Sequence, residues 1–137
     1  IQHSQLVPTI VPIQLVQLGE ITIVCCAGEV TTIAGQRLKQ SVAKALGAQS
    51  SEKTWLISYC NDYMGYVTTN EEYQLQAYEG GHTLYGQWTL GALQTRFSTL
   101  AQQMRLEKVD RTYDQNLRPL IPPKHELAKR TNNIYSQ

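Results

Sequence analysis

The chain has 137 residues, of which 42% are hydrophobic, so it is long enough for one compact core or for part of a larger one. Its 12 basic and 11 acidic residues give a net charge of +1 and are mixed along the sequence, which excludes the basic stripe of a nucleic-acid-binding protein. No apolar run approaches the roughly 20 residues that span a bilayer.

The beginning of the chain indicates a fragment of a longer protein. It starts with Ile1 and lacks the charged start, apolar middle and small-residue cleavage site of a signal peptide, so we expect any targeting signal to lie upstream. Pro8 and Pro12 lie among apolar residues and favour an extended lead-in.

Two strands are predicted next. Apolar residues recur over positions 13–18, and the β-branched run at positions 21–24 follows a turn at Gly19 and Glu20. Because the second strand is apolar on both faces, we expect it to be a central strand that is buried on both sides.

A turn containing Glu29 then leads into a helix. Thr31 or Thr32 can cap its start, and Gly47 is a suitable residue just beyond its end. The aromatic and β-branched content of residues 54–60 predicts another strand, which completes a βαβ unit. We therefore predict an α/β fold with a mixed sheet and flanking helices.

The last third of this fold is predicted to be helical. Residues 69–72 have the Thr-x-x-Glu spacing of a capping box, which predicts a short helix to about Tyr78, stopped by Gly80 and Gly81. An apolar stripe over residues 89–104 predicts a further helix, capped by Thr89.

A domain boundary is predicted after residue 104. Residues 1–104 carry the predicted fold, whereas residues 105–137 are polar, and the prolines within 118–124 prevent a regular element there. We interpret 105–137 as a tail or linker with at most a short helix at 125–130.

Polar residues follow both predicted parallel strands. In α/β sheets, sites collect beyond the carboxyl ends of the strands, and those loops carry Glu29 and the group Asn61, Asp62, Tyr63 and Tyr66. A carboxylate beside a phenol suits a hard metal ion or a polarised carbonyl. Two structural alternatives stay open. Glu29 could have no role beyond complementing the dipole at the helix N-terminus, and Tyr66 could be a structural ring with a hydrogen-bonded hydroxyl.

Several other kinds of site have no support. His3, His82 and His125 do not have the spacing that places two imidazoles on one helix face. No serine lies in a G-x-S-x-G elbow, and no glycine-rich phosphate loop is present.

The three cysteines are Cys25, Cys26 and Cys60, which cannot all pair with one another and lack C-x-x-C spacing. We interpret them as small buried apolar residues, and their number leaves the redox compartment open.

Two segments of the chain resemble the neutral ceramidase family. GEVTTIAGQRL at residues 28–38 resembles the family pattern P-G-E-x-T-x-x-A-G-R-R-L, and NDYMGYVTTNEEY at 61–73 resembles N-x-Y-x-x-Y-x-T-T-x-E-E-Y. The second segment continues into QAYEGGHTLYG at 76–86, which is similar to Q-x-Y-E-x-x-S-T-x-Y-G. The resemblance extends from about residue 8 to residue 104.

The resemblance implies a zinc amidase. Neutral ceramidases hydrolyse the amide of ceramide to a sphingoid base and a fatty acid, with zinc held by two histidines, a glutamate and a tyrosine. The resemblance implies that Glu29 and Tyr66 are the zinc ligands and that Tyr78 hydrogen-bonds the substrate amide or the tetrahedral intermediate. Zinc polarises the amide carbonyl and activates water, and a phenol can stabilise the developing negative charge.

The resemblance also implies what lies outside the chain. The two zinc histidines and a serine of the catalytic site belong to upstream motifs, so we expect this chain to be the carboxy-terminal part of the catalytic domain and inactive alone. Its partners would be ceramide, the upstream part of the domain and, through the lipid substrate, a membrane surface. A secreted or cell-surface location is likewise suggested by the family.

Three positions depart from the family patterns. Ala27 replaces the usual proline, Gln36 replaces the first of two arginines, and His82 stands where serine is usual, so substrate preference stays open. The alternative hypothesis is a non-catalytic module that keeps the fold for lipid or protein binding. A serine hydrolase of unrelated origin is disfavoured by the missing elbow motif.

Overall fold

The computed structural model describes residues 8–112, 117–118, 123–125 and 128. At its centre is a three-stranded sheet in the order β1 (Ile13–Leu18), β2 (Ile21–Cys26) and β4 (Thr54–Ile57). β1 is antiparallel to β2, and β2 is parallel to β4. A second, two-stranded sheet pairs β3 (Glu29–Val30) with β5 (Tyr66–Val67) in parallel. The predicted α/β class with a mixed sheet is confirmed.

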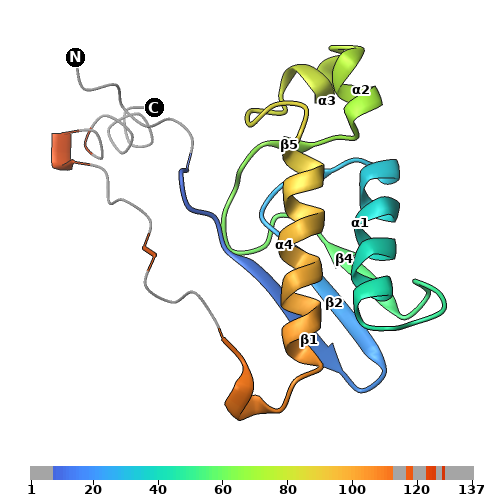
Figure 1. The fold of residues 1–137 in the computed structure, drawn as a ribbon. Coiled ribbons are helices and arrows are strands. Elements are labelled where there is room, and N and C mark those ends of the chain that lie inside the picture. The colour runs from blue at the N-terminus through green and yellow to red at the C-terminus, as the bar shows by residue number, and fades with distance from the viewer. Residues whose placement is uncertain (1–7, 113–116, 119–122, 126–127, 129–137) are drawn as a thin grey trace.

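Two long helices cover one face of the three-stranded sheet. They are α1 (Thr32–Ala45) and α4 (Thr89–Met104), which lie side by side in Figure 1. Two short helices, α2 (Asn70–Gln74) and α3 (Tyr78–Gly81), gather at one end of the molecule, near β5. A 3-10 turn at Lys108–Asp110 follows α4.

The hydrophobic core lies between the sheet and the two long helices. β2 contributes Val24 and Cys26, α1 contributes Leu38 and Val42, and α4 contributes Phe97, all fully buried. Burying one large aliphatic or aromatic side chain stabilises a fold by about 1.5–3 kcal/mol, so this layer holds the helices to the sheet.

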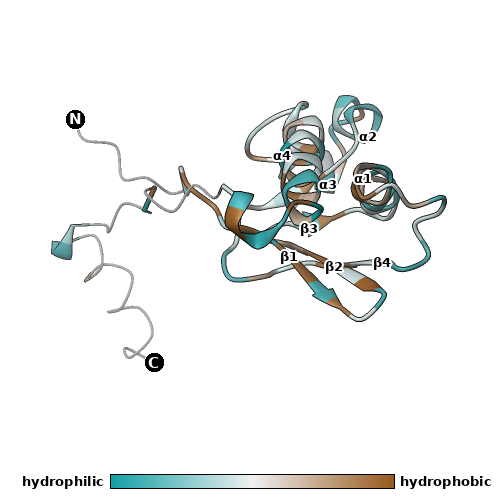
Figure 2. Cartoon of the chain, turned by 60° about the horizontal axis from the view of Figure 1, so that its bottom comes forward, coloured by the Kyte–Doolittle hydropathy of each residue, from teal (hydrophilic) through white to brown (hydrophobic). Residues whose placement is uncertain are grey.

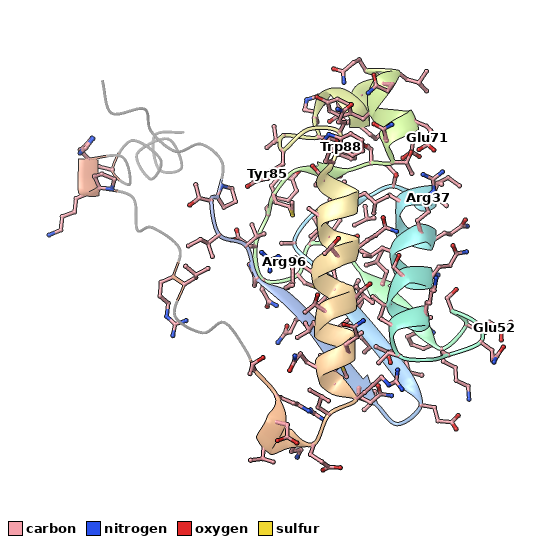
Figure 3. The ribbon with its side chains drawn as sticks, in the orientation of Figure 1. Arg37, Glu52, Glu71, Tyr85, Trp88 and Arg96 are labelled. Atoms are coloured by element: carbon pink, nitrogen blue, oxygen red, sulfur yellow. The ribbon has the colours of Figure 1, made fainter. Side chains whose placement is uncertain are left out.

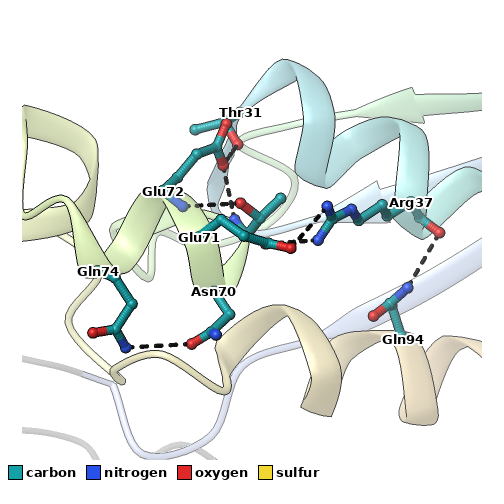
Figure 4. Close-up of polar contacts among 8 residues, drawn as sticks. Thr31, Arg37, Asn70, Glu71, Glu72, Gln74 and Gln94 are labelled. Carbon is teal, nitrogen blue, oxygen red and sulfur yellow. Dashed lines mark hydrogen bonds and ion pairs between the residues drawn. The ribbon is translucent and has the colours of Figure 1, made fainter.

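The local signals for α1 and α2 are confirmed, with one change. Thr69 accepts a hydrogen bond from the backbone of Glu72, whose side chain in turn accepts one from the Thr69 backbone, which completes the capping box. Thr31 occupies the N-cap position of α1, but its hydroxyl donates to the Glu72 carboxylate at 2.7 Å instead of capping its own helix (Figure 4). The start of α1 is therefore tied to α2.

A salt bridge joins the same two helices. Arg37 on α1 and Glu71 on α2 point toward one another in Figure 3, and two hydrogen bonds of 2.8 and 3.1 Å link the guanidinium to the carboxylate. Both side chains are largely exposed. Gln94 on α4 donates to the Arg37 carbonyl oxygen (Figure 4) and to the Ser41 hydroxyl, so α4 is also joined to α1 by polar contacts.

Backbone conformation corrects two predicted boundaries. The strand expected over residues 54–60 ends at Ile57, because Tyr59 and Asn61 have positive φ and cannot continue a β-strand. The helix expected over residues 69–78 is divided into α2 and α3 by Gln76, whose φ is +48°.

The glycine signals near α3 and the cap of α4 are also corrected. Gly80 and Gly81 lie inside α3 and do not stop a helix before it. Thr89 is the first residue of α4, where its hydroxyl donates to the Gly86 carbonyl, and Trp88 precedes it.

The cysteines are free thiols, and only Cys26 is fully buried as expected, since Cys25 and Cys60 are partly exposed. The short helix expected at 125–130 falls mostly outside the described residues. Within the described part of the chain, no helix combines the length and the apolar character that a membrane span requires.

Candidate functional site

The site begins with the pairing of β3 and β5. Glu29 and Tyr66 are partners in this short parallel ladder, so their Cα atoms lie opposite one another. Backbone hydrogen bonds from Glu29 N to the Gly65 carbonyl (2.9 Å) and from Thr31 N to the Val67 carbonyl (3.1 Å) fix the register. Two residues that are 37 positions apart are thereby held side by side at the carboxyl end of β2.

Two glycines allow the chain to approach itself this closely. A Cβ at Gly28 would lie 2.7 Å from a methyl group of the buried Val67 and 3.0 Å from the Gly65 carbonyl oxygen. Gly65 has a φ of +80°, which side chains rarely adopt. The pairing of β3 with β5 therefore depends on the glycines that precede Glu29 and Tyr66.

Tyrosines surround the Glu29 carboxylate. The Tyr63 hydroxyl donates a hydrogen bond of 2.6 Å to Glu29 Oε1, and the Tyr63 ring is stacked on that of Tyr59, with ring centroids 6.2 Å apart. Tyr66 and Tyr78 form an edge-to-face pair with centroids 5.7 Å apart. We call Tyr59, Tyr63, Tyr66 and Tyr78 the tyrosine cluster.

The hydrogen bonds set the charge of the site. The Tyr63 hydroxyl, followed by those of Tyr59 and Tyr66, stabilises the ionised carboxylate and lowers the pKa of Glu29 below its ordinary value. In return, the carboxylate raises the pKa of Tyr63 to about 12 and also raises that of Tyr66. At neutral pH the site is thus an anionic carboxylate surrounded by protonated phenols.

His82 supports the outer side of the cluster. Its ring lies 4.5 Å from the Tyr78 ring and 6.4 Å from the Tyr66 ring, measured between centroids. His82 Nδ1 is 2.7 Å from the Tyr78 carbonyl oxygen, and the His82 carbonyl accepts from the Tyr66 backbone at 3.2 Å. When the imidazole is neutral, this contact places the proton on Nδ1 and leaves Nε2 as an acceptor.

The structure brings together the three residues singled out in the sequence. Glu29, Tyr66 and Tyr78 lie in one cluster at the end of the molecule that carries α2 and α3, at the top of Figure 1. Asn61 and Asp62 do not join them, because Asn61 donates to the Gln14 side chain and Asp62 accepts from the Tyr63 backbone.

Tyr59 received no role from the sequence, and Tyr63 was named only as one of the polar residues that follow the predicted strand. Tyr63 is three positions before Tyr66 and 34 positions after Glu29, and Gly65, with a φ of +80°, lies between Tyr63 and Tyr66. Gly65 is a sequence signal for a turn, because glycine adopts a positive φ most readily. It does not indicate in which direction the chain turns.

Glu29 is not the cap of α1. α1 has no acidic residue in its first turn, and its N-cap residue is Thr31, two positions after Glu29. The carboxylate instead accepts from Tyr63. The charge of Glu29 is therefore directed to the tyrosine cluster.

Glu29 and Tyr66 offer oxygen donors to a metal ion, and the His82 imidazole lies beside them, with its ring 6.4 Å from the Tyr66 ring. Among the residues that the structure describes, no three histidine, cysteine, aspartate or glutamate side chains are placed to hold a metal ion. Glu29 and Tyr66 offer one carboxylate and one phenol, whereas zinc sites in proteins have three or four protein ligands. The pair fits a part of a zinc site.

The fold and the site together define a class: an α/β protein with a polar site beyond the carboxyl ends of parallel strands. Residues 2–95 match the sequence profile described as neutral/alkaline non-lysosomal ceramidase, N-terminal. The chain therefore belongs to the neutral/alkaline ceramidase family of hydrolases.

Individual relatives agree with this family. The chain is 42% identical over 99 residues to neutral ceramidase A of Dictyostelium discoideum and 46% identical over 99 residues to the neutral ceramidase of Mycobacterium tuberculosis. Each alignment covers 72% of this chain, but it spans only 14% and 15% of the two relatives.

Solved structures confirm the fold. The chain is similar to the crystal structure of neutral ceramidase from Pseudomonas aeruginosa, with a TM-score of 0.68 and 34% identity over 88% of this chain and 18% of that one. A structure described as ceramidase complexed with C2 gives the same TM-score at 36% identity, over 83% of this chain and 18% of that chain.

Proposed function

We propose that this chain supplies Glu29 and Tyr66 as two ligands of a zinc site in an enzyme that hydrolyses the N-acyl amide of ceramide to sphingosine and a fatty acid. The observation that carries the proposal is the β3–β5 register, which pairs Glu29 with Tyr66 in a chain of the ceramidase family. The other two ligands would be histidines from the upstream part of the same catalytic domain.

The surroundings of Glu29 support its role as a ligand. A ligating carboxylate is commonly oriented by a second hydrogen bond from an outer residue. The Tyr63 hydroxyl provides such a bond to Oε1, and the lowered pKa of Glu29 keeps the carboxylate ionised, as metal binding requires.

Each residue of the proposed site has a distinct task. When bound, zinc supplies a Lewis acid that polarises an amide carbonyl and activates a water molecule. Glu29 and Tyr66 hold and orient the ion. Tyr78 lies edge-on to Tyr66 with 66% of its surface exposed, so its hydroxyl can donate a hydrogen bond to the oxyanion that develops on the substrate.

The proposal also places the chain within the longer protein. Residues 1–104 would form the carboxy-terminal portion of the catalytic domain, and residues 105–137 a tail or linker. Because the matching profile is described as N-terminal, that catalytic domain would itself be the amino-terminal domain of the full-length enzyme. The chain spans 14–15% of the curated relatives compared above, so it would be inactive alone.

The test uses the chain joined to its upstream segment. Zinc content and ceramide hydrolysis are measured for the unmodified protein and for Glu29→Ala, Tyr66→Phe and Tyr78→Phe. Glu29→Ala and Tyr66→Phe should weaken zinc binding, whereas Tyr78→Phe should keep the zinc and lower kcat by about 10²–10³-fold, as loss of an oxyanion donor does. Tyr73→Phe, on α2 outside the tyrosine cluster, is the matched control.

Two results would contradict the proposal. Full activity of residues 1–137 without the upstream segment would show that the zinc site is complete in this chain. Unchanged zinc content and activity in both Glu29→Ala and Tyr66→Phe would favour the alternative, a non-catalytic module of ceramidase fold that binds lipid or protein.

A further inference from the structure

The three-stranded sheet has two different faces. Successive side chains of a strand point to opposite faces, and in β2 every second residue is fully buried, beginning with Thr22. Those buried residues face α1 and α4. Figure 2 shows the described helices on that side of β1, β2 and β4, and none on the other side.

The second face is almost entirely apolar. The strand register places Val16, Ile23 and Trp55 in one row across all three strands, and Leu18 opposite Ile21 in a neighbouring row. We call this surface the outer sheet face. Its six largest apolar side chains are Val16, Leu18, Ile21, Ile23, Trp55 and Ile57.

The side chains of the outer sheet face are open to solvent in this chain. Trp55 is 54% exposed and Leu18 is 66% exposed, although both lie in strands. The prediction that β2 is buried on both sides is therefore wrong for this chain as it stands, since Ile21 and Ile23 are only partly covered. A contiguous apolar surface of this kind marks an interaction site.

Two physical arguments favour a protein cover. Parallel strands joined by a helical crossover occur almost only in sheets with both faces covered, and β2, α1 and β4 form such a unit. No charged residue belongs to the outer sheet face, which therefore has no cation for a lipid headgroup. The nearby Lys53 and Glu20 lie at the ends of the strands and form an ion pair with each other, so the charge of Lys53 is already neutralised.

We propose that the outer sheet face is an internal interface of the full-length protein, covered by an apolar layer from the part of the catalytic domain outside residues 1–137. This rests on the proposal that the chain is one portion of a longer ceramidase. The length of the relatives indicates where the covering layer comes from. More than four-fifths of each similar solved chain lies outside the region that this chain matches, which is enough protein to cover the outer sheet face.

The test uses Trp55 as the probe. With Trp88→Phe in the background, Trp55 is the only tryptophan of residues 1–137. Its quenching by acrylamide is measured in residues 1–137 and in the chain joined to its upstream segment, in each case as the difference between the protein with Trp55 and its Trp55→Phe variant. We expect strong quenching in residues 1–137, somewhat below that in urea-unfolded protein because Trp55 is 54% exposed, and a several-fold smaller quenching constant in the longer protein. Equal quenching in the two proteins would overturn the proposal.

The quenching of Trp55 also distinguishes two other possible occupants of the outer sheet face, a second copy of the chain and a lipid surface. Protection of Trp55 that grows with the concentration of residues 1–137 would identify a second copy as the occupant, and protection by phosphatidylcholine vesicles would identify a lipid surface. Either result, with no further protection in the longer protein, would contradict an internal interface.

A charged substitution gives an independent measurement. Trp55→Glu should lower the Tm of the longer protein by several degrees and leave that of residues 1–137 nearly unchanged. Thr95→Glu, on the exposed side of α4, is the matched control and should change neither. Zinc content is measured in parallel: a protected Trp55 without zinc would refute the proposed zinc site alone, and zinc with a quenched Trp55 would refute the interface alone.

Discussion

Tyr63 makes the largest contribution to the lowered pKa of Glu29, through a hydrogen bond of 2.6 Å. Tyr63→Phe removes the largest of the interactions that lower the pKa of Glu29, so this pKa should rise toward its ordinary value. Because the pKa of Glu29 is lowered in the folded chain, its contribution to stability is present above the unfolded pKa and is lost as the pH falls through the folded pKa. The substitution should reduce this acid sensitivity.

The measurement is a titration of the Glu29 side-chain carbon by ¹³C NMR. Tyr73→Phe removes a hydroxyl from α2 and should leave the titration of Glu29 unchanged. If Tyr63→Phe also leaves the pKa of Glu29 unchanged, the hydrogen bond between Tyr63 and Glu29 does not stabilise the ionised carboxylate in solution.

Gly28 allows the close approach of β3 to β5. Gly28→Ala places a Cβ 2.7 Å from the stiff, buried Val67 side chain, so the strands must separate. We expect a loss of about 1–3 kcal/mol in the free energy of unfolding, the usual cost of overpacking. Urea denaturation measures this loss.

The control makes the same substitution where there is space. A Cβ at Gly91, near the start of α4, meets nothing within 4 Å. Alanine is a better helix former than glycine, so Gly91→Ala should stabilise the chain by about 0.5–1 kcal/mol. Effects of the same sign in both variants would mean that the close approach at Gly28 is not tight.

At the scale of secondary structure, α1 and α2 are linked by a contact that depends on pH. Arg37 holds the pKa of Glu71 at about 2, below the ordinary 4.5, mainly through the hydrogen bonds between the two side chains. The stabilisation by this contact is complete above about pH 4.5 and is lost as the pH falls toward 2. Because both groups are exposed, the effect is small and is screened by salt.

A comparison of urea midpoints at falling pH tests this contact. Wild type should be more stable than Glu71→Gln near neutral pH, and the difference should vanish at low pH. Arg37→Met should remove the difference at every pH, since the carboxylate then has lost its partner. A difference that persists in the Arg37→Met background would assign the effect of Glu71 to another contact.

The elements that the sequence predicted well are those with local causes. The capping box at Thr69 and Glu72 and the strand pair around Gly19 depend on residues that are near one another in the chain, and the structure confirms both. β3 and β5 were missed, because a two-residue strand has no periodicity and its partner is 37 positions away. Gln76 divides a predicted helix although it carries no glycine or proline signal.

The candidate site divides in the same way. Glu29 and Tyr66 could be chosen from the sequence, because their positions after strands and their family patterns mark them. Tyr59 could not, and Tyr63 could be named only as a member of the loop group, since nothing in the sequence distinguishes a phenol that reaches Glu29 from one that does not. The structure shows a positive φ at both Tyr59 and Gly65, on either side of Tyr63.

At the scale of the whole molecule, a single layer of core between helices and sheet holds the described fold together. Phe97 is the largest fully buried side chain of that layer. Phe97→Ala should cost about 3–5 kcal/mol, and natural domains are stable by only about 5–15 kcal/mol. The substitution therefore removes a large share of the stability of residues 1–137.

The longer protein should respond differently to Phe97→Ala. If the outer sheet face is covered there, a second apolar layer supports the same strands, and the variant should stay folded at urea concentrations that unfold the variant of residues 1–137. Leu75→Ala, at a side chain with 78% of its surface exposed, is the control and should change the free energy of unfolding by less than about 0.5 kcal/mol in either protein. Equal urea midpoints for Phe97→Ala in both lengths would mean that the two layers do not support one another.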